Sequence, residues 1–190
     1  MKPAKDLPTS ESGRAGRTGW IVLIAASGLG LSLLFACVTP FAALATLAAL
    51  HLRAEERWGV IGFVWITNQI LGFGVLGYPL TWNCAAWGVA IGVSCGFAVV
   101  AAGALSTDRP APLALSLPFV GAFAAFEAGL YAAGRLLSGS ADAFGPPVMR
   151  HVFWVNAASL GGLMVLYWLL SAVGGAFGAK PTGSFAGALR

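Results

Sequence analysis

The chain has 190 residues, of which 58% are hydrophobic and only 9% are charged. A soluble domain usually carries about 25% charged residues, so seven acids and eleven bases are too few to cover a soluble fold. The composition excludes a disordered chain, a nucleic-acid module and a water-soluble enzyme as leading interpretations. A mean hydropathy of +0.81 and apolar runs near twenty residues long instead predict a protein whose partner is the lipid bilayer.

Six apolar runs follow a polar amino-terminal segment. Residues 1–19 are predicted to form a disordered cytoplasmic tail, residues 20–177 a transmembrane domain, and residues 178–190 a second cytoplasmic tail. The six runs cover residues 20–38, 41–52, 58–76, 85–105, 113–137 and 151–177. The sequence therefore predicts an all-α fold, a polytopic integral membrane bundle of six transmembrane helices with a short second helix.

The length of the second run leaves its topology open. Its twelve residues would cover about 18 Å as helix, against a hydrocarbon core of about 30 Å, so it is either re-entrant or a short full span. With six spans, nine of the eleven Lys and Arg residues lie on the side of the termini, whereas five spans divide them six against five. The positive-inside rule then favours six spans, with both termini cytoplasmic, in the cell (inner) membrane.

Glu127 is the one acidic residue well inside an apolar run. A carboxylate at this depth costs several kcal/mol unless it is protonated, paired or hydrated, and such residues typically face a cavity and have a role. Tyr131 lies four residues further on, on the same helical face, where it can donate a hydrogen bond to Glu127 or line the same cavity. The alternative is a protonated Glu127 that is hydrogen-bonded between helices and purely structural.

Two adjacent amides, Asn68 and Gln69, lie near the centre of the third run and need polar partners. Glycines follow them toward the outer end of this run, which leaves room for a cavity or a close neighbour. The predicted topology places these groups in the outer half of the membrane, below two loops that could cover them. The predicted substrate-binding residues are Asn68, Gln69, Trp82, Asn83, Glu127, Tyr131, His151 and Asn156. Such a pocket suits a neutral or cationic heteroaromatic solute, and interhelical amide bonding is the alternative.

A ridge of small residues at four-residue spacing runs along the fifth apolar segment. Its members are Gly121, Ala125, Gly129 and Ala133. Ridges of this kind let another helix approach closely. We expect this one to pack inside the monomer rather than against another subunit.

Other chemistry has little support in the sequence. No metal-ligand cluster, phosphate-binding loop or nucleophile elbow is present, so we expect no catalytic residue, metal site or cofactor, and not an enzyme. His51 and His151 lie on opposite sides of the predicted membrane, which argues against a shared haem. The three cysteines are too few and too widely spaced for a disulfide scaffold. No nucleic-acid partner is expected.

In architecture, residues 20–177 resemble the S components of energy-coupling-factor vitamin transporters, and Ala26 and Gly30 partly match the alanine-spaced pattern of that family's first helix. The resemblance implies six helices, an outward-facing pocket for a small-molecule solute, gating by outer loops, and docking on a membrane coupling subunit that works with ATPases. Two alternatives stay open. One is a structural or assembly subunit of a larger membrane complex, and the other is a small proton-coupled carrier in which Glu127 changes its protonation.

Overall fold

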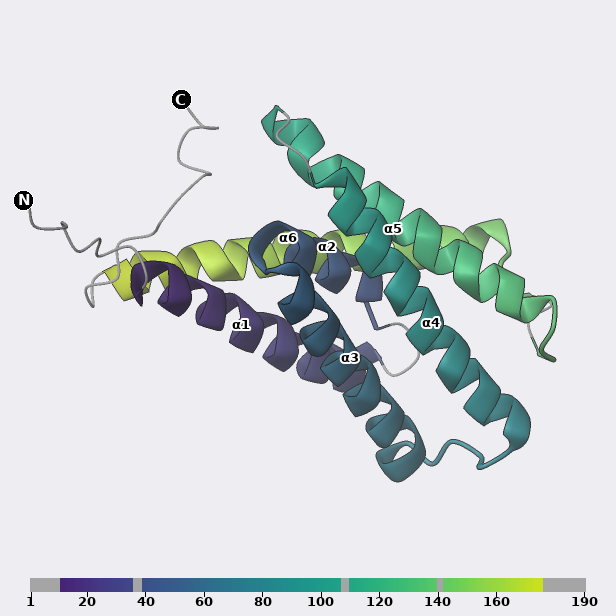
Figure 1. Cartoon of the computed structure of the whole chain (residues 1–190). Helices are drawn as coiled ribbons and strands as arrows, with labels where there is room; N and C mark the ends of the chain where they lie inside the picture. The colour runs from purple at the N-terminus through teal and green to yellow at the C-terminus, as the bar shows by residue number, and fades with distance from the viewer. Residues whose placement is uncertain (1–10, 36–38, 107–109, 140–141, 176–190) are drawn as a thin grey trace, which may run out of the picture.

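A computed structural model of the chain describes residues 11–35, 39–106, 110–139 and 142–175 (Figure 1). Every regular element in these ranges is helical, and the elements are α1 (Glu11–Phe35), α2 (Phe41–His51), α3 (Ala54–Ile70), a short π-helix η1 (Leu71–Val75), α4 (Trp82–Leu105), α5 (Ala111–Gly134) and α6 (Pro146–Gly175). Four stretches are long and apolar enough to cross a membrane: Ala54–Val75, Trp82–Leu105, Leu113–Gly134 and Pro146–Leu169. The predicted all-α class is confirmed, and the described residues are those of a helical membrane protein.

The observed helix boundaries differ from the predicted ones at both ends of the chain. Helix α1 begins at Glu11, inside the segment predicted to be a disordered tail, and Arg17 in this extension pairs with Glu56 of α3 at 3.4 Å. Helix α6 begins at Pro146 rather than His151, because the fixed φ of proline suits the first turn of a helix. Residues 1–10 and 176–190 lie outside the described residues, so the tails predicted there stay predictions.

The helix ends gather at two ends of the bundle (Figure 1). The end that holds the start of α1, the α2–α3 turn and the end of α6 carries Arg17, Arg53 and Arg57, and we call it the basic end. The end that holds the α3–α4 and α5–α6 connections is called the loop end. Hydrogen bonds between Asn83 and Ser138 tie the two connections of the loop end together.

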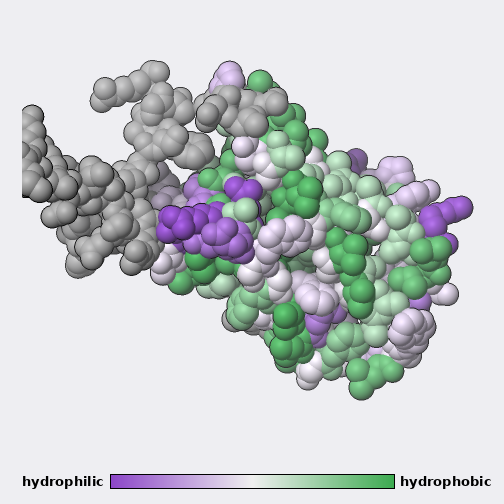
Figure 2. Space-filling view, viewed as in Figure 1, coloured by the Kyte–Doolittle hydropathy of each residue, from purple (hydrophilic) through white to green (hydrophobic). Residues whose placement is uncertain are grey.

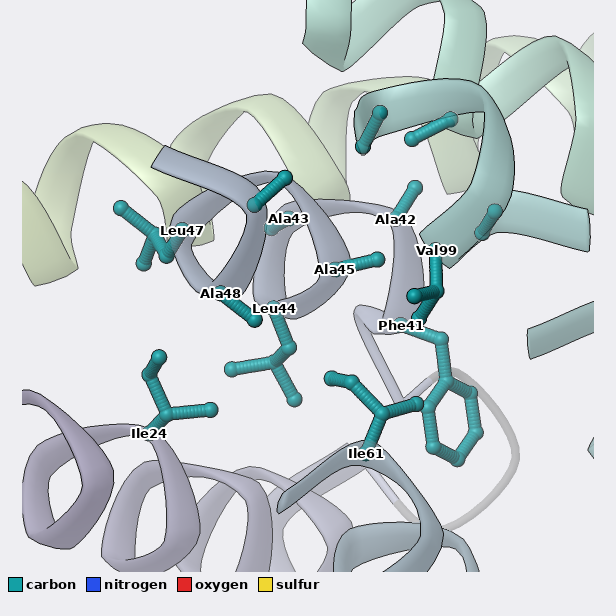
Figure 3. Close-up of a cluster of buried hydrophobic side chains, with 14 of the residues drawn as sticks. Ile24, Phe41, Ala42, Ala43, Leu44, Ala45, Leu47, Ala48, Ile61 and Val99 are labelled. Atoms are coloured by element: carbon teal, nitrogen blue, oxygen red, sulfur yellow. The ribbon is translucent and has the colours of Figure 1, made fainter. Parts of the chain in front are cut away.

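Helix α2 lies at the centre of the bundle and is buried on all sides. Each residue from Phe41 to Ala49 is buried, as expected for a helix that is apolar all round. Figure 3 shows Leu44 of α2 directed toward the helices that carry Ile24 and Ile61. The hydroxyl of Thr46, a polar side chain in this helix, donates to the carbonyl of Ala42 at 2.7 Å. Eleven residues cover about 16 Å. Thr39, Pro40 and Phe41 are all buried, so α2 starts inside the bundle.

Glycines set the spacing of α4 from its neighbours. Gly88 and Gly92 face α3, and a Cβ on Gly92 would lie only 2.6 Å from the indole of Trp65. The same indole donates to the carbonyl of Gly88 at 2.9 Å. On the other side, a Cβ on Gly129 of α5 would lie 2.5 Å from the hydroxyl of Ser94. Close backbone approach at small residues is typical of membrane helix packing.

The predicted ridge on α5 therefore packs partly inside the monomer. Gly121 contacts Leu105 of α4, and Gly129 contacts Ser94 and Phe97 of the same helix. Ala125 and Ala133 are half-buried. The α4 glycines at four-residue spacing, Gly88, Gly92 and Gly96, are a second ridge with the same sequence signal, and they were not among the predicted packing residues.

The outer faces of the helices are apolar. Figure 2 shows hydrophobic residues over much of the visible face, with a compact hydrophilic group beside the grey segments. On α4, Val89, Val93 and Phe97 are exposed at four-residue spacing, and on α6 the indoles of Trp154 and Trp168 are exposed. An apolar surface of this extent fits a lipid environment rather than water.

Candidate functional site

Asn156 of α6 caps the buried amino-terminal end of α2. Its side-chain oxygen accepts a hydrogen bond from the backbone N–H of Ala43 at 3.2 Å, and its amide nitrogen donates to the carbonyl of Val152 at 3.0 Å. The first N–H groups of a helix have no partner inside the helix, and a side-chain oxygen usually satisfies one of them. Here that oxygen comes from another helix, and Asn156 is only 2% exposed.

Asn68 of α3 holds the residues just before α2. Its amide nitrogen donates to the hydroxyl of Thr39 at 2.8 Å, and the amide of Gln69 donates to the side-chain oxygen of Asn68 at 3.3 Å. The oxygen of Gln69 lies where a Cβ on Gly88 of α4 would be, so a larger residue at Gly88 would displace it. The two adjacent amides thus join α3 to the start of α2 and to α4.

The first glycine that follows these amides, Gly72, gives room to the ring of Tyr78. Tyr78 folds back so that its backbone N–H donates to the carbonyl of Gly72 at 3.0 Å. A Cβ on Gly72 would lie 2.7 Å from the Tyr78 ring. Gly77 has a φ of +69°, in the left-handed region that glycine adopts without steric cost. Tyr78 therefore fills the space beside Gly72, whereas the space beside Gly74 and Gly77 is open.

Asn83 and Trp82 lie at the loop end, away from the amides. Asn83 exchanges two hydrogen bonds with the backbone of Ser138, at 3.2 and 3.3 Å, and the Trp87 indole donates to the same carbonyl at 3.0 Å. Trp82 is 85% exposed and borders an open surface groove of about 320 Å³ with Phe73 and Leu80. Exposed tryptophans at helix ends are typical of the membrane interface.

Glu127 is flanked along α5 by two phenylalanines whose rings contact α6 and α2. Phe123, one turn before it, contacts Phe153 of α6 with ring centroids 5.2 Å apart, and Phe126, beside it, contacts Phe41 of α2 at 5.8 Å. Glu127 itself is only 8% exposed. Within the described ranges no hydrogen bond or ion pair involves its carboxyl group. It is a buried acid that this part of the structure leaves without a polar partner.

Tyr131 and His151 do not join Glu127. Tyr131 is exposed at the surface of α5 and packs edge-on against Phe144, with ring centroids 5.4 Å apart. Of the two possibilities for Tyr131, the hydrogen bond to Glu127 is not formed in this structure. His151 is exposed near the start of α6. Both side chains therefore lie at the surface of the loop half of the bundle.

The eight candidate residues thus fall into separate groups. Asn68 and Asn156 bind the start of α2, and Gln69 binds Asn68. Asn83 closes the loop end, Glu127 is buried on α5, and three side chains are exposed. Thr39 was not among the predicted site residues, although a threonine and a proline before an apolar run are an ordinary sign of a helix start. Among the described residues no group of three or more His, Cys, Asp or Glu could hold a metal ion.

Comparison of this chain with protein-family models, with curated proteins and with solved structures finds no match.

Proposed function

We propose that the protein binds a small solute at Glu127 and takes part in its uptake across the membrane. The observation that carries this proposal is the burial of Glu127, 8% exposed, without a hydrogen bond or ion pair to any described residue. Intramembrane acids are costly and mark substrate or ion pathways by default. A solute that brings a positive charge or an N–H donor would supply the missing partner.

The surroundings of Glu127 favour a flat solute. Phe123 and Phe126 flank it along α5 and form edge-on and tilted ring pairs with Phe153 and Phe41. Aromatic faces attract cations and the edges of other rings. A heteroaromatic ring with a protonated or N–H-bearing nitrogen therefore combines the two kinds of contact that this region offers. In this proposal Asn68 and Asn156 do not touch the solute and instead hold the start of α2 in place.

The resemblance to the S components of energy-coupling-factor transporters extends the proposal to partners. A coupling subunit with its ATPases would then supply the energy for uptake. Ala26 of α1 is exposed, and the space beside Gly30 is open where its Cβ would be. This face of α1 is available to a second protein, whereas the α5 ridge is used against α4. The proton-coupled carrier is the variant in which Glu127 binds a proton instead.

Six spans with both termini on the cytoplasmic side belong to the same proposal. The division of basic residues supports this orientation, in which the basic end faces the cytoplasm. The proposal expects a membrane-impermeant thiol reagent, added from outside to a cysteine-free background, to label a cysteine at Asp142 and to leave one at Ala54 unlabelled. External labelling at Ala54 would contradict the six-span arrangement.

One set of contacts favours the second candidate, a structural or assembly subunit. Asn68, Asn83 and Asn156 are all engaged in hydrogen bonds that join one segment of the chain to another. Polar groups of this kind stabilise helix association by about 0.6 kcal/mol each on average. In this alternative Glu127 is protonated and stays unliganded, and the apolar outer faces contact other subunits.

Mass spectrometry of small molecules that copurify with the protein tests the proposal. The Glu127→Gln variant keeps the shape of the side chain but loses its charge, so it should retain the fold and bind the solute about 10-fold more weakly, as expected for a lost charge-assisted bond of about 1.4 kcal/mol. Glu127→Leu should abolish binding while the melting temperature stays equal or rises, because a costly buried acid is removed.

Glu55→Gln is the matched control, since Glu55 is an exposed acid at the basic end. It should leave both solute retention and the melting temperature unchanged. If the wild type copurifies with no solute, and Glu127→Leu lowers the melting temperature while Glu127→Gln does not, Glu127 is a structural residue and the assembly role replaces the transport role.

A further inference from the structure

A shallow groove runs between α3 and α4 at the basic end. It has a volume of about 160 Å³ and is lined by Arg57, Trp58, Val99, Val100, Gly103 and Ala104. Most of this lining is apolar, and Arg57 is the one charged group that the described residues contribute to it. We propose that this groove holds one anionic phospholipid, with the lipid phosphate bound by Arg57 and an acyl chain lying along the apolar wall.

Arg57 is fixed in place by the fold. Its Nε donates to the carbonyl of Leu52, at the end of α2, with a distance of 3.0 Å. Its Nη1 lies over Gly103, where a Cβ would come within 2.9 Å of it. One hydrogen bond therefore holds the guanidinium in place, and its Nη1 lies in the space that Gly103 leaves without a side chain.

The acid nearest to Arg57 in the sequence is already engaged. One carboxylate oxygen of Glu56 pairs with Arg17 at 3.4 Å, and the other accepts the backbone N–H of Arg53 at 2.9 Å. Within the described ranges, Arg57 forms no ion pair. A guanidinium presents its N–H groups in a planar fork that matches two phosphate oxygens, so a phosphate is the chemistry that complements this side chain.

The walls of the groove favour a lipid over a free phosphate. Trp58 is 51% exposed, and Val100 on the facing helix is also exposed, so the groove opens onto the apolar surface of the bundle. Tryptophan beside a basic residue at a helix end is typical of the membrane–water interface. A free phosphate would meet apolar walls that offer it nothing, whereas an acyl chain can lie against Val99, Val100 and Ala104.

Native mass spectrometry of the intact chain in a mild non-ionic detergent tests the proposal, with dioleoyl phosphatidylglycerol and dioleoyl phosphatidylcholine as the two probes. The wild type should retain one phosphatidylglycerol in preference to phosphatidylcholine. Arg57→Gln should weaken this binding about fivefold, the equivalent of about 1 kcal/mol for one basic residue near the membrane surface. Arg57→Lys, which keeps the charge, should retain more of the lipid than Arg57→Gln does.

Two further variants separate lipid binding from folding. Arg150→Gln removes an exposed charge at the loop end and should bind phosphatidylglycerol like the wild type. Gly103→Ala leaves every charge in place but displaces the guanidinium, so it should weaken lipid binding in the same direction as Arg57→Gln. Equal retention of the two lipids by the wild type, equal binding by Arg57→Gln and Arg150→Gln, or displacement of the lipid by millimolar inorganic phosphate would each overturn the proposal. These outcomes do not depend on solute binding at Glu127.

Discussion

The two ends of α2 are held by different kinds of contact. At its amino-terminal end, inside the bundle, amide side chains from α3 and α6 bind Thr39 and the backbone N–H of Ala43. At its carboxyl-terminal end, Trp20 of α1 lies between His51 and Tyr167, with ring centroids 3.6 and 3.8 Å apart. One end therefore depends on directional hydrogen bonds and the other on stacked rings.

The difference follows from what each end must satisfy. The start of a helix presents N–H groups that need acceptors, and in the bundle centre only side chains can supply them. At the carboxyl-terminal end of α2, side chains lie close to two backbone carbonyls. His51 Nδ1 lies 3.0 Å from the carbonyl of Leu47, and Arg57 Nε donates to the carbonyl of Leu52, the residue that follows α2. The rings at the carboxyl-terminal end of α2 can then contribute packing. The amino-terminal end, which we call the amide end, therefore fixes the position of α2, and the carboxyl-terminal end, which we call the aromatic end, provides contact area.

Trp20→Ala should have the largest effect on stability. Trp20 is only 4% exposed and stacks on residues of two other helices. Replacing a buried Trp by Ala costs about 3–5 kcal/mol in soluble cores, and we expect about 3 kcal/mol here because lipid can fill part of the space. The free energy of unfolding measured by SDS titration in mixed micelles checks this value. Trp20→Phe, which keeps a ring in the stack, should lose less than half as much.

Asn156→Leu should lower the free energy of unfolding less than Trp20→Ala does, and it acts at the amino-terminal end of α2. The substitution keeps the side-chain volume but leaves the N–H of Ala43 without an acceptor in a buried position, which costs about 1–3 kcal/mol. The same change at Asn83, whose hydrogen bonds to Ser138 are exposed, is the control and should cost about 0.5 kcal/mol or less. Equal losses in the free energy of unfolding from both variants would show that burial of the Asn156 cap does not add to its contribution to stability.

The sequence predicts the helices of this protein better than it predicts their ends. Long apolar runs without charges have one stable form in lipid, which is why the all-α class follows from composition alone. Helix α1 nevertheless extends back to Glu11 through polar residues, and its Arg17 finds Glu56 on another helix. Contacts of this kind lie outside local periodicity, so the amino-terminal boundary could not be read from the run itself.

The polar candidate residues can be identified from the sequence by their position inside apolar runs, but their hydrogen-bond partners cannot. The position of Asn156 near the outer start of the sixth apolar run makes it a candidate, yet its partner, the N–H of Ala43, is 113 residues away. The identity of the partner of Asn156 depends on where the start of the short α2 lies in the bundle. The spacing of the α4 glycines, by contrast, was visible in the sequence, and it gives the α3–α4 contact that Trp65 and Gln69 use.

The smallest expected effect tests whether the amide end acts through a specific pair. Asn68 donates to the hydroxyl of Thr39 at 2.8 Å, and a double-mutant cycle of Asn68→Leu with Thr39→Val isolates this hydrogen bond, because each change removes one partner. Cycles on hydrogen bonds between membrane helices give about 0.6 kcal/mol on average, and we expect a coupling of this size in the free energy of unfolding. Thr39 and Asn68 also have other contacts, so each single variant should lose more than the coupling itself. A coupling of zero would mean that the hydrogen bond does not hold the start of α2, and that the Asn156 cap alone distinguishes the amide end from the aromatic end.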